Sequence, residues 1–311
     1  MIVKTPIGKL KKQGGVCDFL NKDNVAGLVC AMPFIIGFIA FFIVPMGMSL
    51  YYSFTNFNLI RTPRWVGFSN YAGLWGSADF WQSIRITFYY TLTSVPLRLF
   101  FALMVALILL KTNKLTGVLR AVYYLPSMLG GSIAVAILWR MMFRADGTIN
   151  SVISFFSPGF DFPWISDTRT AIWVLVMLAV WQFGSSMLIF LASLKQIPEQ
   201  LYESASIDGA GSFRRFFMIT LPLITPTIFF NVIMQTINGL LMFTQVFVIF
   251  GNRGNPMGAT RVYALEMYRQ AFLFERAGMA SAMAWYMLII IAALTAILFL
   301  TKRFWVYEGG L

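Results

Sequence analysis

The sequence predicts an all-α, polytopic membrane protein with six transmembrane helices. Of its 311 residues, 59% are hydrophobic and only 12% are charged, with a mean hydropathy of +0.73, whereas a soluble domain carries about 25% charged residues. The apolar residues also gather into six runs, each long enough to cross a bilayer at roughly 20 residues per helix. The six runs lie near residues 25–50, 87–110, 122–143, 171–194, 222–250 and 279–301.

The first run follows a basic tail, residues 1–24, which contains five lysines. A basic stretch also begins a secretory signal peptide, but this apolar run is too long and no small-residue cleavage site closes it. We therefore expect an uncleaved first helix, a cytoplasmic N-terminus and a tail that contacts anionic lipid headgroups. Six crossings then place residues 111–121, 195–221 and 302–311 in the cytoplasm as well. All nine lysines fall on that side, although the fifteen arginines are divided between both sides.

Residues 25–86 are expected to form this first helix and an outside loop rich in aromatic residues, which favour the membrane interface. The second run carries Arg98 near its middle, about 16 Å from either end at 1.5 Å per residue. A guanidinium at that depth should face the helix bundle or an aqueous cavity. Arg98 is thus expected either to hold helices together through backbone carbonyls or to contact a bound solute.

The fourth run carries Gln182 among its apolar residues and leads into a polar island, Glu199–Pro222. Acidic residues near its start suit the positive end of a helix dipole. Gly209 and Gly211 are expected to end this short helix, and Ser212 is placed to cap a second one. A long polar segment between two membrane helices indicates contact with a partner.

Amide side chains form a polar stripe along the fifth run. At 100° per residue, four of them fall within an arc of about 80°: Asn231, Gln235, Asn238 and Gln245. In lipid such a stripe must face protein or water. It is either interhelical hydrogen bonding, typically worth about 0.6 kcal/mol per contact, or the wall of a solute path, where amides both donate and accept. Asn238-Gly239 also predicts a helix break near mid-span.

The last loop, residues 251–278, contains charged residues such as Arg261, Glu266 and Arg269 and is expected to be solvated. Lys302-Arg303 then ends the sixth run at the cytoplasmic face, before a short C-terminal tail.

The polar island resembles the "EAA" loop of ABC importer permeases. The resemblance rests on Glu203-Ser204-Ala205, on Gly209 four residues later and on Ile219-Thr220-Leu221-Pro222; Ser204 replaces the alanine of the family. A series before the island also matches the family in order and spacing, so that the resemblance runs from about residue 30 to residue 303. The series is Arg120, Pro126, Trp139-Arg140, Gly147 and Asn150.

The resemblance implies a type I ABC importer transmembrane domain over residues 87–301, similar to the F-type subunit of maltose and multiple-sugar permeases. Residues 195–221 would be its cytoplasmic coupling loop, which docks on an ATPase subunit. The residues that match this role are Glu203, Ser204, Ala205, Asp208, Gly209, Ile219, Leu221 and Pro222. The resemblance also places an amide that contacts sugar in some family members at position 238.

The partners that the resemblance implies are a second permease, two ATP-binding cassette ATPase subunits and an extracellular solute-binding protein. For this last partner the resemblance implies a docking surface on the loop 251–278, as the alternative to a merely solvated loop. The implied solute is a carbohydrate, an oligosaccharide in particular, with glycerol phosphate or another polar solute as alternatives. ATP and Mg²⁺ would bind the ATPase subunits, because this chain has no GxxxxGK[ST] phosphate loop.

Composition excludes several other functions. The chain has no histidine and two cysteines, so zinc, haem and most acid–base catalysis are not expected. The net charge of +12 comes from basic residues that flank the apolar runs, so no nucleic acid is expected. An ion-coupled secondary carrier would need membrane carboxylates, and none of the twelve acidic residues lies in the six runs. An enzyme acting on lipid-linked sugars would need an acidic motif at the interface, and none is present.

Overall fold

The computed structural model describes residues 22–110 and 116–307. In these residues every regular element is helical, apart from an isolated bridge between Thr55 and Trp65, so that the all-α prediction is confirmed. The helices are α1 (Lys22–Phe38), α2 (Val44–Ser53), α3 (Ser69–Trp75), α4 (Ala78–Ile108), α5 (Thr116–Leu129), α6 (Ile133–Met142), α7 (Thr148–Phe156), α8 (Ala171–Trp181), α9 (Gly184–Leu194), α10 (Glu199–Ile207), α11 (Ser212–Arg215), α12 (Leu221–Leu223), α13 (Thr225–Leu240), α14 (Thr244–Phe250), α15 (Tyr263–Tyr268) and α16 (Ala277–Trp305), with π-helical turns η2 (Ile39–Ile43), η3 (Phe216–Thr220) and η4 (Arg269–Leu273).

Six membrane spans are present when each bent helix pair counts as one. Three spans are continuous: Gly27–Ser53, α4 and α16. The other three are broken, with bends of 98° between α5 and α6, 40° between α8 and α9, and 63° between Ser212–Leu223 and α13. The predicted number of spans is confirmed, but half of the spans are not straight helices.

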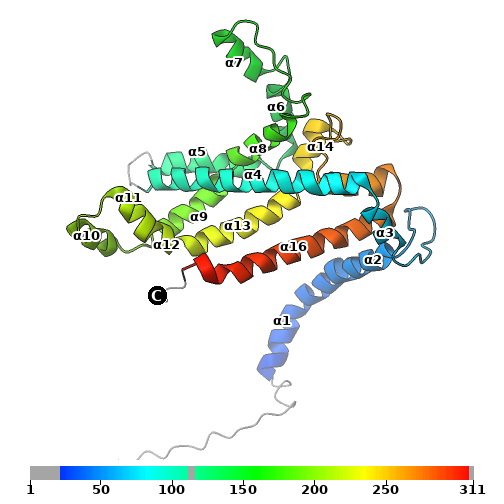
Figure 1. Cartoon of the computed structure of the whole chain (residues 1–311). Helices are drawn as coiled ribbons and strands as arrows, with labels where there is room; N and C mark the ends of the chain where they lie inside the picture. Colours follow the sequence, from blue (N-terminus) through cyan, green and yellow to red (C-terminus); the bar gives the residue numbers. More distant parts are fainter. Residues whose placement is uncertain (1–21, 111–115, 308–311) are drawn as a thin grey trace, which may run out of the picture.

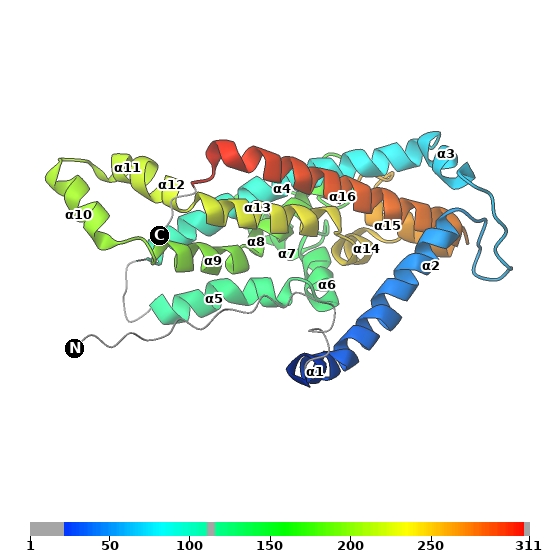
Figure 2. The same ribbon diagram turned by 90° about the horizontal axis from the view of Figure 1, so that it is seen from below.

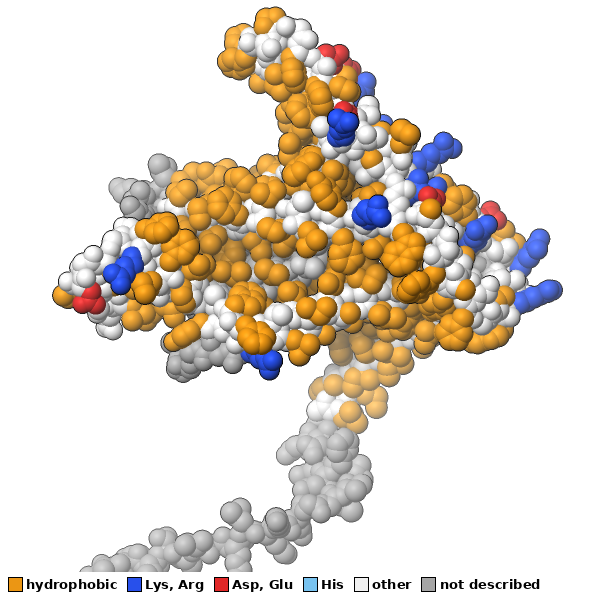
Figure 3. All heavy atoms as spheres, viewed as in Figure 1, with side chains coloured by type: hydrophobic (Ala, Val, Ile, Leu, Met, Phe, Trp, Pro, Cys, Tyr) orange, Lys and Arg blue, Asp and Glu red, His pale blue; other side chains and the backbone are white. Residues whose placement is uncertain are grey.

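The bundle is built around α4, which contacts α8, α9, α13 and α15, while α16 packs against α2 and α13 (Figure 1). Helix α1 points away from the bundle in both ribbon views (Figure 2), and the most apolar window of its span is 0% buried. Hydrophobic side chains cover most of the visible face of the bundle, with charged ones concentrated at α10–α11 and toward the opposite end (Figure 3). This distribution fits a body surrounded by lipid.

Small residues allow the helices to approach closely. A Cβ added to Gly184 of α9 would lie 2.3 Å from the carbonyl oxygen of Tyr123 in α5. Ala102 and Ala106 of α4 are fully buried in the cluster that α4 forms with α9. Such contacts replace the hydrophobic drive that is absent between helices in lipid.

Two of the π-helical turns precede prolines. Pro45 follows η2 and Pro222 follows η3, each by two residues. A proline ring lacks a donor and clashes with the carbonyl four residues earlier. The wider π turn gives this carbonyl room, so both helices continue past a residue that would otherwise break them.

The third predicted run, residues 122–143, corresponds to one sharply bent span and not to a straight helix. The helix begins earlier, at Thr116, and α6 starts a new direction after Gly130-Gly131-Ser132. Two glycines weaken the helix at this point, and the side chain of Ser132 caps α6 by accepting from the Val135 backbone N–H. Hydropathy reports only the composition of a segment, so this change of direction was not visible in it.

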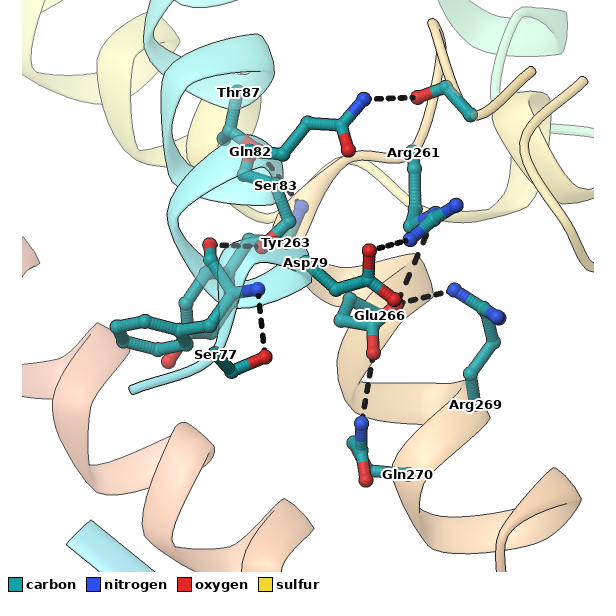
Figure 4. A network of polar contacts seen from close by, with 12 residues as sticks. Ser77, Asp79, Gln82, Ser83, Thr87, Arg261, Tyr263, Glu266, Arg269 and Gln270 are labelled. Atoms are coloured by element: carbon teal, nitrogen blue, oxygen red, sulfur yellow. Dashed lines mark hydrogen bonds and ion pairs between the residues drawn. The ribbon is translucent and has the colours of Figure 1, made fainter. Parts of the chain in front are cut away.

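The loop 251–278 is also not the solvated connection that its charges indicated. Helix α15 packs against α4 and α16, and Glu266 is 1% exposed. The Glu266 carboxylate accepts from Arg269 Nη1 at 2.6 Å and Gln270 Nε2 at 2.8 Å, while Arg261 pairs with Asp79 of α4 at 2.7 Å (Figure 4). The pair of Arg261 and Asp79 therefore joins this loop to α4, while the bonds of Glu266 stay within the loop segment itself.

Candidate functional site

A polar cavity of about 310 Å³ lies between α4, α5, α8 and α13. It forms where three helix breaks meet, and one residue of each break lines it: Gly131 between α5 and α6, Gln182 between α8 and α9, and Met242 between α13 and α14. The remaining lining residues are Tyr90, Ser94, Val95, Arg98, Ser127, Leu178, Ala179, Gln235, Asn238, Gly239 and Gln245. Broken helices are tolerated at membrane depth where the freed backbone lines a cavity or is buried in protein.

Side chains satisfy the backbone groups that the breaks release. The carbonyl oxygen of Gly130 accepts from Gln182 Nε2 at 3.3 Å and from Gln245 Nε2 at 3.2 Å. The carbonyl oxygen of Gln182 accepts from Arg98 Nη2 at 2.6 Å. A Cβ at Gly130 would meet the Gln182 side chain at 2.1 Å, so glycine allows this approach. The amides and Arg98 hold the broken helices together.

The structure brings five of the six predicted path residues to this cavity: Arg98, Gln182, Gln235, Asn238 and Gln245. Asn231 lies outside it, 1% exposed, with its Nδ2 bonded to the Thr227 carbonyl of its own helix at 3.0 Å. A helical wheel gives direction but no depth, and Asn231 lies about 6 Å below Gln235 along the axis. The predicted break near Asn238-Gly239 occurs slightly later, at residues 241–243.

The lining amides differ in what they bond. Gln235 donates to Ser186 Oγ at 3.0 Å, while its Oε1 has no partner among the described residues. Asn238 is exposed and forms no hydrogen bond within the described chain. Of the predicted stripe, Asn238 is thus the amide whose donors and acceptor are available to a solute.

Sequence reasoning did not select Tyr90 and Ser94, which also line the cavity. Tyr90, Ser94 and Arg98 follow one another on α4 at intervals of four residues, so that the three share a helix face. This spacing was a readable signal, because a helix that places Arg98 at a cavity also places Ser94 there.

The second candidate region is an exposed elbow, residues 199–215, formed by α10 and α11 at one end of the bundle (Figure 1). Helix α10 ends at Ile207, and Gly209 adopts a φ of 74°, the left-handed turn expected of a glycine there. The expected cap at Ser212 is wrong: Gly211 occupies the N-cap position and Ser212 is the first helical residue. Glycine allows that turn without help from a hydroxyl.

No residue of α10 or α11 is buried. The elbow is fixed to itself by a bond from Arg215 Nη1 to Ser206 Oγ at 2.8 Å, and to η3 by the Tyr202 and Thr220 hydroxyls, 2.9 Å apart. Ile207 remains 87% exposed. These hydrogen bonds fix the conformation of the elbow, while its side chains stay exposed.

The structure places the predicted coupling residues in two groups. Ala205, Asp208 and Ile219 line a hollow of about 260 Å³ beside Arg214 and Arg215. Among the others, Glu203 and Ser204 lie exposed on α10, Gly209 forms the turn, and Leu221 and Pro222 lie half-buried in α12, outside the hollow. Within the described part of the chain, no three His, Cys, Asp or Glu side chains gather as a metal site would require.

Comparison with known proteins agrees with this architecture. Residues 23–306 match the family model of the binding-protein-dependent transport system inner membrane component. A probable ABC transporter permease protein, YesP of Bacillus subtilis, is 48% identical over 289 residues, covering 93% of this chain and 94% of that protein. The trehalose/maltose transport system permease protein MalF of Thermococcus litoralis is 31% identical, covering 91% and 95%.

A solved structure has the same fold. The crystal structure of a bacterial ABC transporter involved in the import of the acidic polysaccharide alginate contains a chain that superposes with a TM-score of 0.78 at 20% identity, over 92% of this chain and 97% of that one. With the family match spanning nearly all of the described residues, the chain belongs to the family of binding-protein-dependent transport system inner membrane components.

Proposed function

We propose that this chain is the permease subunit of an ATP-driven importer and forms, with a second permease, the path for an oligosaccharide. The observation that carries the proposal is the amide-lined cavity at the meeting point of the broken spans. Its volume of about 310 Å³ lies at the small end of the range typical of small-molecule sites. Amides and hydroxyls both donate and accept, as the hydroxyls of a sugar require.

Relatives support a sugar as the solute. Their names include transport systems for starch degradation products, arabinooligosaccharides, lactose and trehalose/maltose. An extracellular binding protein delivers the sugar in this proposal, as the family description implies. The same site accommodates glycerol phosphate or another polar solute as the alternative.

We assign the elbow to contact with the ATPase subunits. It protrudes from the bundle, buries none of its own α10 or α11 residues, and belongs to a chain without a phosphate loop of its own. Two ATPase subunits hold ATP and Mg²⁺ and receive this elbow and its counterpart from the second permease. ATP then shifts the transporter between conformations through contacts that differ between them.

The proposed orientation follows from the elbow. It lies on the cytoplasmic side, together with both chain ends. The bond from the Tyr307 backbone N–H to Thr225 Oγ1 at 2.8 Å supports this, because it holds the end of α16 beside the start of α13. The exposed span Gly27–Ser53 is free to contact lipid or the second permease.

The test is uptake of a panel of labelled oligosaccharides into proteoliposomes that contain the complete transporter. The panel comprises arabino-, malto- and galacturono-oligosaccharides. We expect uptake that requires ATP, both ATPase subunits and the binding protein. Uptake that runs on an ion gradient without the ATPase subunits would instead show a secondary carrier and overturn the proposal.

A further inference from the structure

We propose that the solute of this transporter is anionic, an oligosaccharide that carries a carboxylate, and that Arg98 binds its acidic group. This inference rests on the proposed function and concerns the same cavity. It starts from the charge of the lining: among the cavity residues of the described chain, Arg98 is cationic and none is acidic.

Within the described residues, no carboxylate neutralises the guanidinium of Arg98. It has five N–H donors, of which Nη2 bonds the Gln182 carbonyl oxygen and Nε has no partner in the described residues. No carboxylate of the described chain lies within ion-pair distance of it. A charge held at membrane depth without a counter-ion is costly. An anionic solute would supply that counter-ion, and a carboxylate matches the planar fork of arginine.

The neighbours of Arg98 suit the rest of a sugar. Ser94 and Tyr90 continue along the same face of α4, and Asn238 faces the cavity from α13 with its amide free of other bonds. These neutral groups both donate and accept and would bind hydroxyls. The cavity therefore combines one site for an acid with several for hydroxyls, as a sugar acid requires.

A second cavity extends the positive character away from the elbow. It measures about 1040 Å³ and lies between α6, α14 and the loops that flank α7. Its lining includes Arg140 of α6 and, from the connection between α6 and α7, Arg144 and Asp146. Arg144 is paired with Asp146 at 3.0 Å, whereas Arg140 bonds the carbonyl oxygen of Val248 at 3.4 Å. One arginine of this cavity is thus also free of a carboxylate.

Helix α14 contributes to the lining of both cavities. Gln245, near the start of α14, lines the first cavity, and residues 248–250 at its end line the second. Helix α6 packs along α14 and carries Arg140 beside the second cavity. A solute that follows α14 would meet Arg140 before Arg98. The lining of the second cavity, with two arginines and one aspartate, has a net positive charge, which raises the local concentration of anions.

The experiment uses the complete transporter in proteoliposomes and compares each uronate-containing oligosaccharide with the same sugar after its carboxyl groups are reduced to primary alcohols. The reduced sugar keeps length and linkage and loses the charge. We expect wild-type uptake of the acid to exceed that of the reduced sugar. We expect Arg98→Gln to lower uptake of the acid at least tenfold more than uptake of the reduced sugar, on the order of the loss of a buried charge partner. The loss that both sugars share measures the structural bond from Arg98 to the Gln182 carbonyl oxygen.

Two variants separate charge from structure. Arg98→Lys keeps the charge and a donor for the Gln182 carbonyl, so uptake of the acid should fall only a few-fold, about the difference between a bidentate and a point contact. Arg169→Gln removes an equal charge from an exposed loop position and should leave both uptakes unchanged. Every variant is assayed with the same binding protein. The preference of that binding protein for one sugar therefore cancels when uptake by the variant is divided by uptake by the wild type.

Each outcome decides the inference. Equal losses of the acid and the reduced sugar in Arg98→Gln would make Arg98 a structural residue, and a wild-type transporter that imports only neutral sugars would overturn the proposal outright. Import of phosphorylated sugars with the same dependence on Arg98 would support an anionic solute and move the acidic group from carboxylate to phosphate. If ATP drives uptake of neutral oligosaccharides alone, the proposed function stands and this inference fails.

Discussion

The two ends of this bundle are built in opposite ways. At the α15 end, meaning residues 261–270 and the helix starts that they contact, Glu266 is 1% exposed and receives Arg269 and Gln270 (Figure 4). At the elbow no residue of α10 or α11 is buried. The buried carboxylate at the α15 end is thus paired within the chain, even though buried nitrogen or oxygen atoms of Arg261, Arg269 and Gln270 have no hydrogen-bond partner among the described residues. The elbow instead exposes its side chains, as the proposed contact with a partner subunit requires.

Burial also determines the protonation state of Tyr263 at the α15 end. The Tyr263 hydroxyl donates to the carbonyl oxygen of Met283 at 2.7 Å, and burial raises the pKa of Tyr263 well above its usual value. The hydroxyl therefore remains protonated and continues to join α15 to α16. The backbone N–H of Tyr263 donates to Thr87 Oγ1 at 2.7 Å, and this bond joins α15 to α4.

The largest expected effect on stability is at Glu266. Replacing it by glutamine removes the carboxylate that Arg269 contacts at 2.6 Å, and loss of one partner of a buried ion pair costs about 3–5 kcal/mol. Thermal unfolding of the purified subunit measures this. Asp146→Asn is the matched control, because its pair with Arg144 is largely exposed and exposed pairs contribute about 0–1 kcal/mol. Similar effects of the two variants would contradict a stabilising buried ion pair at the α15 end.

The next-largest effect on stability is expected from a glycine-to-alanine substitution, which can be compared at the two ends. A Cβ at Gly278 would lie 2.1 Å from the Thr55 carbonyl oxygen, whereas a Cβ at Gly209 would meet nothing within 4 Å. Gly278→Ala should therefore destabilise the subunit by about 3 kcal/mol or more, as overpacking against backbone does. Gly209→Ala meets only the strain of its positive φ, about 1–2 kcal/mol. Equal shifts in unfolding temperature would mean that the elbow is packed more tightly than the structure shows.

Features that depend on local composition could be predicted from the sequence, whereas features that depend on how the helices pack could not. Six spans and the left-handed turn at Gly209 followed from hydropathy and from local backbone chemistry. The 98° bend after Leu129 did not, because apolar residues continue on both sides of it. Glu266 was expected in a solvated loop because charge suggests exposure. Its partners Arg269 and Gln270 lie three and four residues later, so their spacing was readable, but the packing of α15 against α4 and α16 that buries Glu266 depends on the fold.

The candidate cavity shows the same limit at single residues. Angular position along the fifth span correctly grouped Gln235, Asn238 and Gln245 on one side. It also included Asn231, which lies at another depth and bonds its own helix. Three residues of the lining could be read from spacing, but the convergence of three helix breaks depends on how the spans pack.

A third effect separates stability from function at the elbow. Glu203→Lys changes an exposed side chain, so the free energy of unfolding should move by less than about 0.5 kcal/mol. If the elbow contacts an ATPase subunit, reversal of this charge should nevertheless lower ATP-driven uptake and recovery of ATPase subunits with the permease. Glu275→Lys, an exposed change at the opposite end, is the control. Unchanged uptake in an assembled complex would remove Glu203 from the coupling surface.

The smallest effect on stability is expected in the cavity between the two ends. Asn238 has no bond within the described chain, so Asn238→Leu should leave unfolding unchanged and lower oligosaccharide uptake about two- to tenfold, as loss of one neutral hydrogen bond does. Gln245→Leu removes a donor to the Gly130 carbonyl and should cost about 0.6 kcal/mol of stability. Measuring unfolding and uptake for both variants separates the roles. Equal losses of stability would place Asn238 among the residues that hold the helices together, because an amide that only meets solute leaves the empty bundle unaffected.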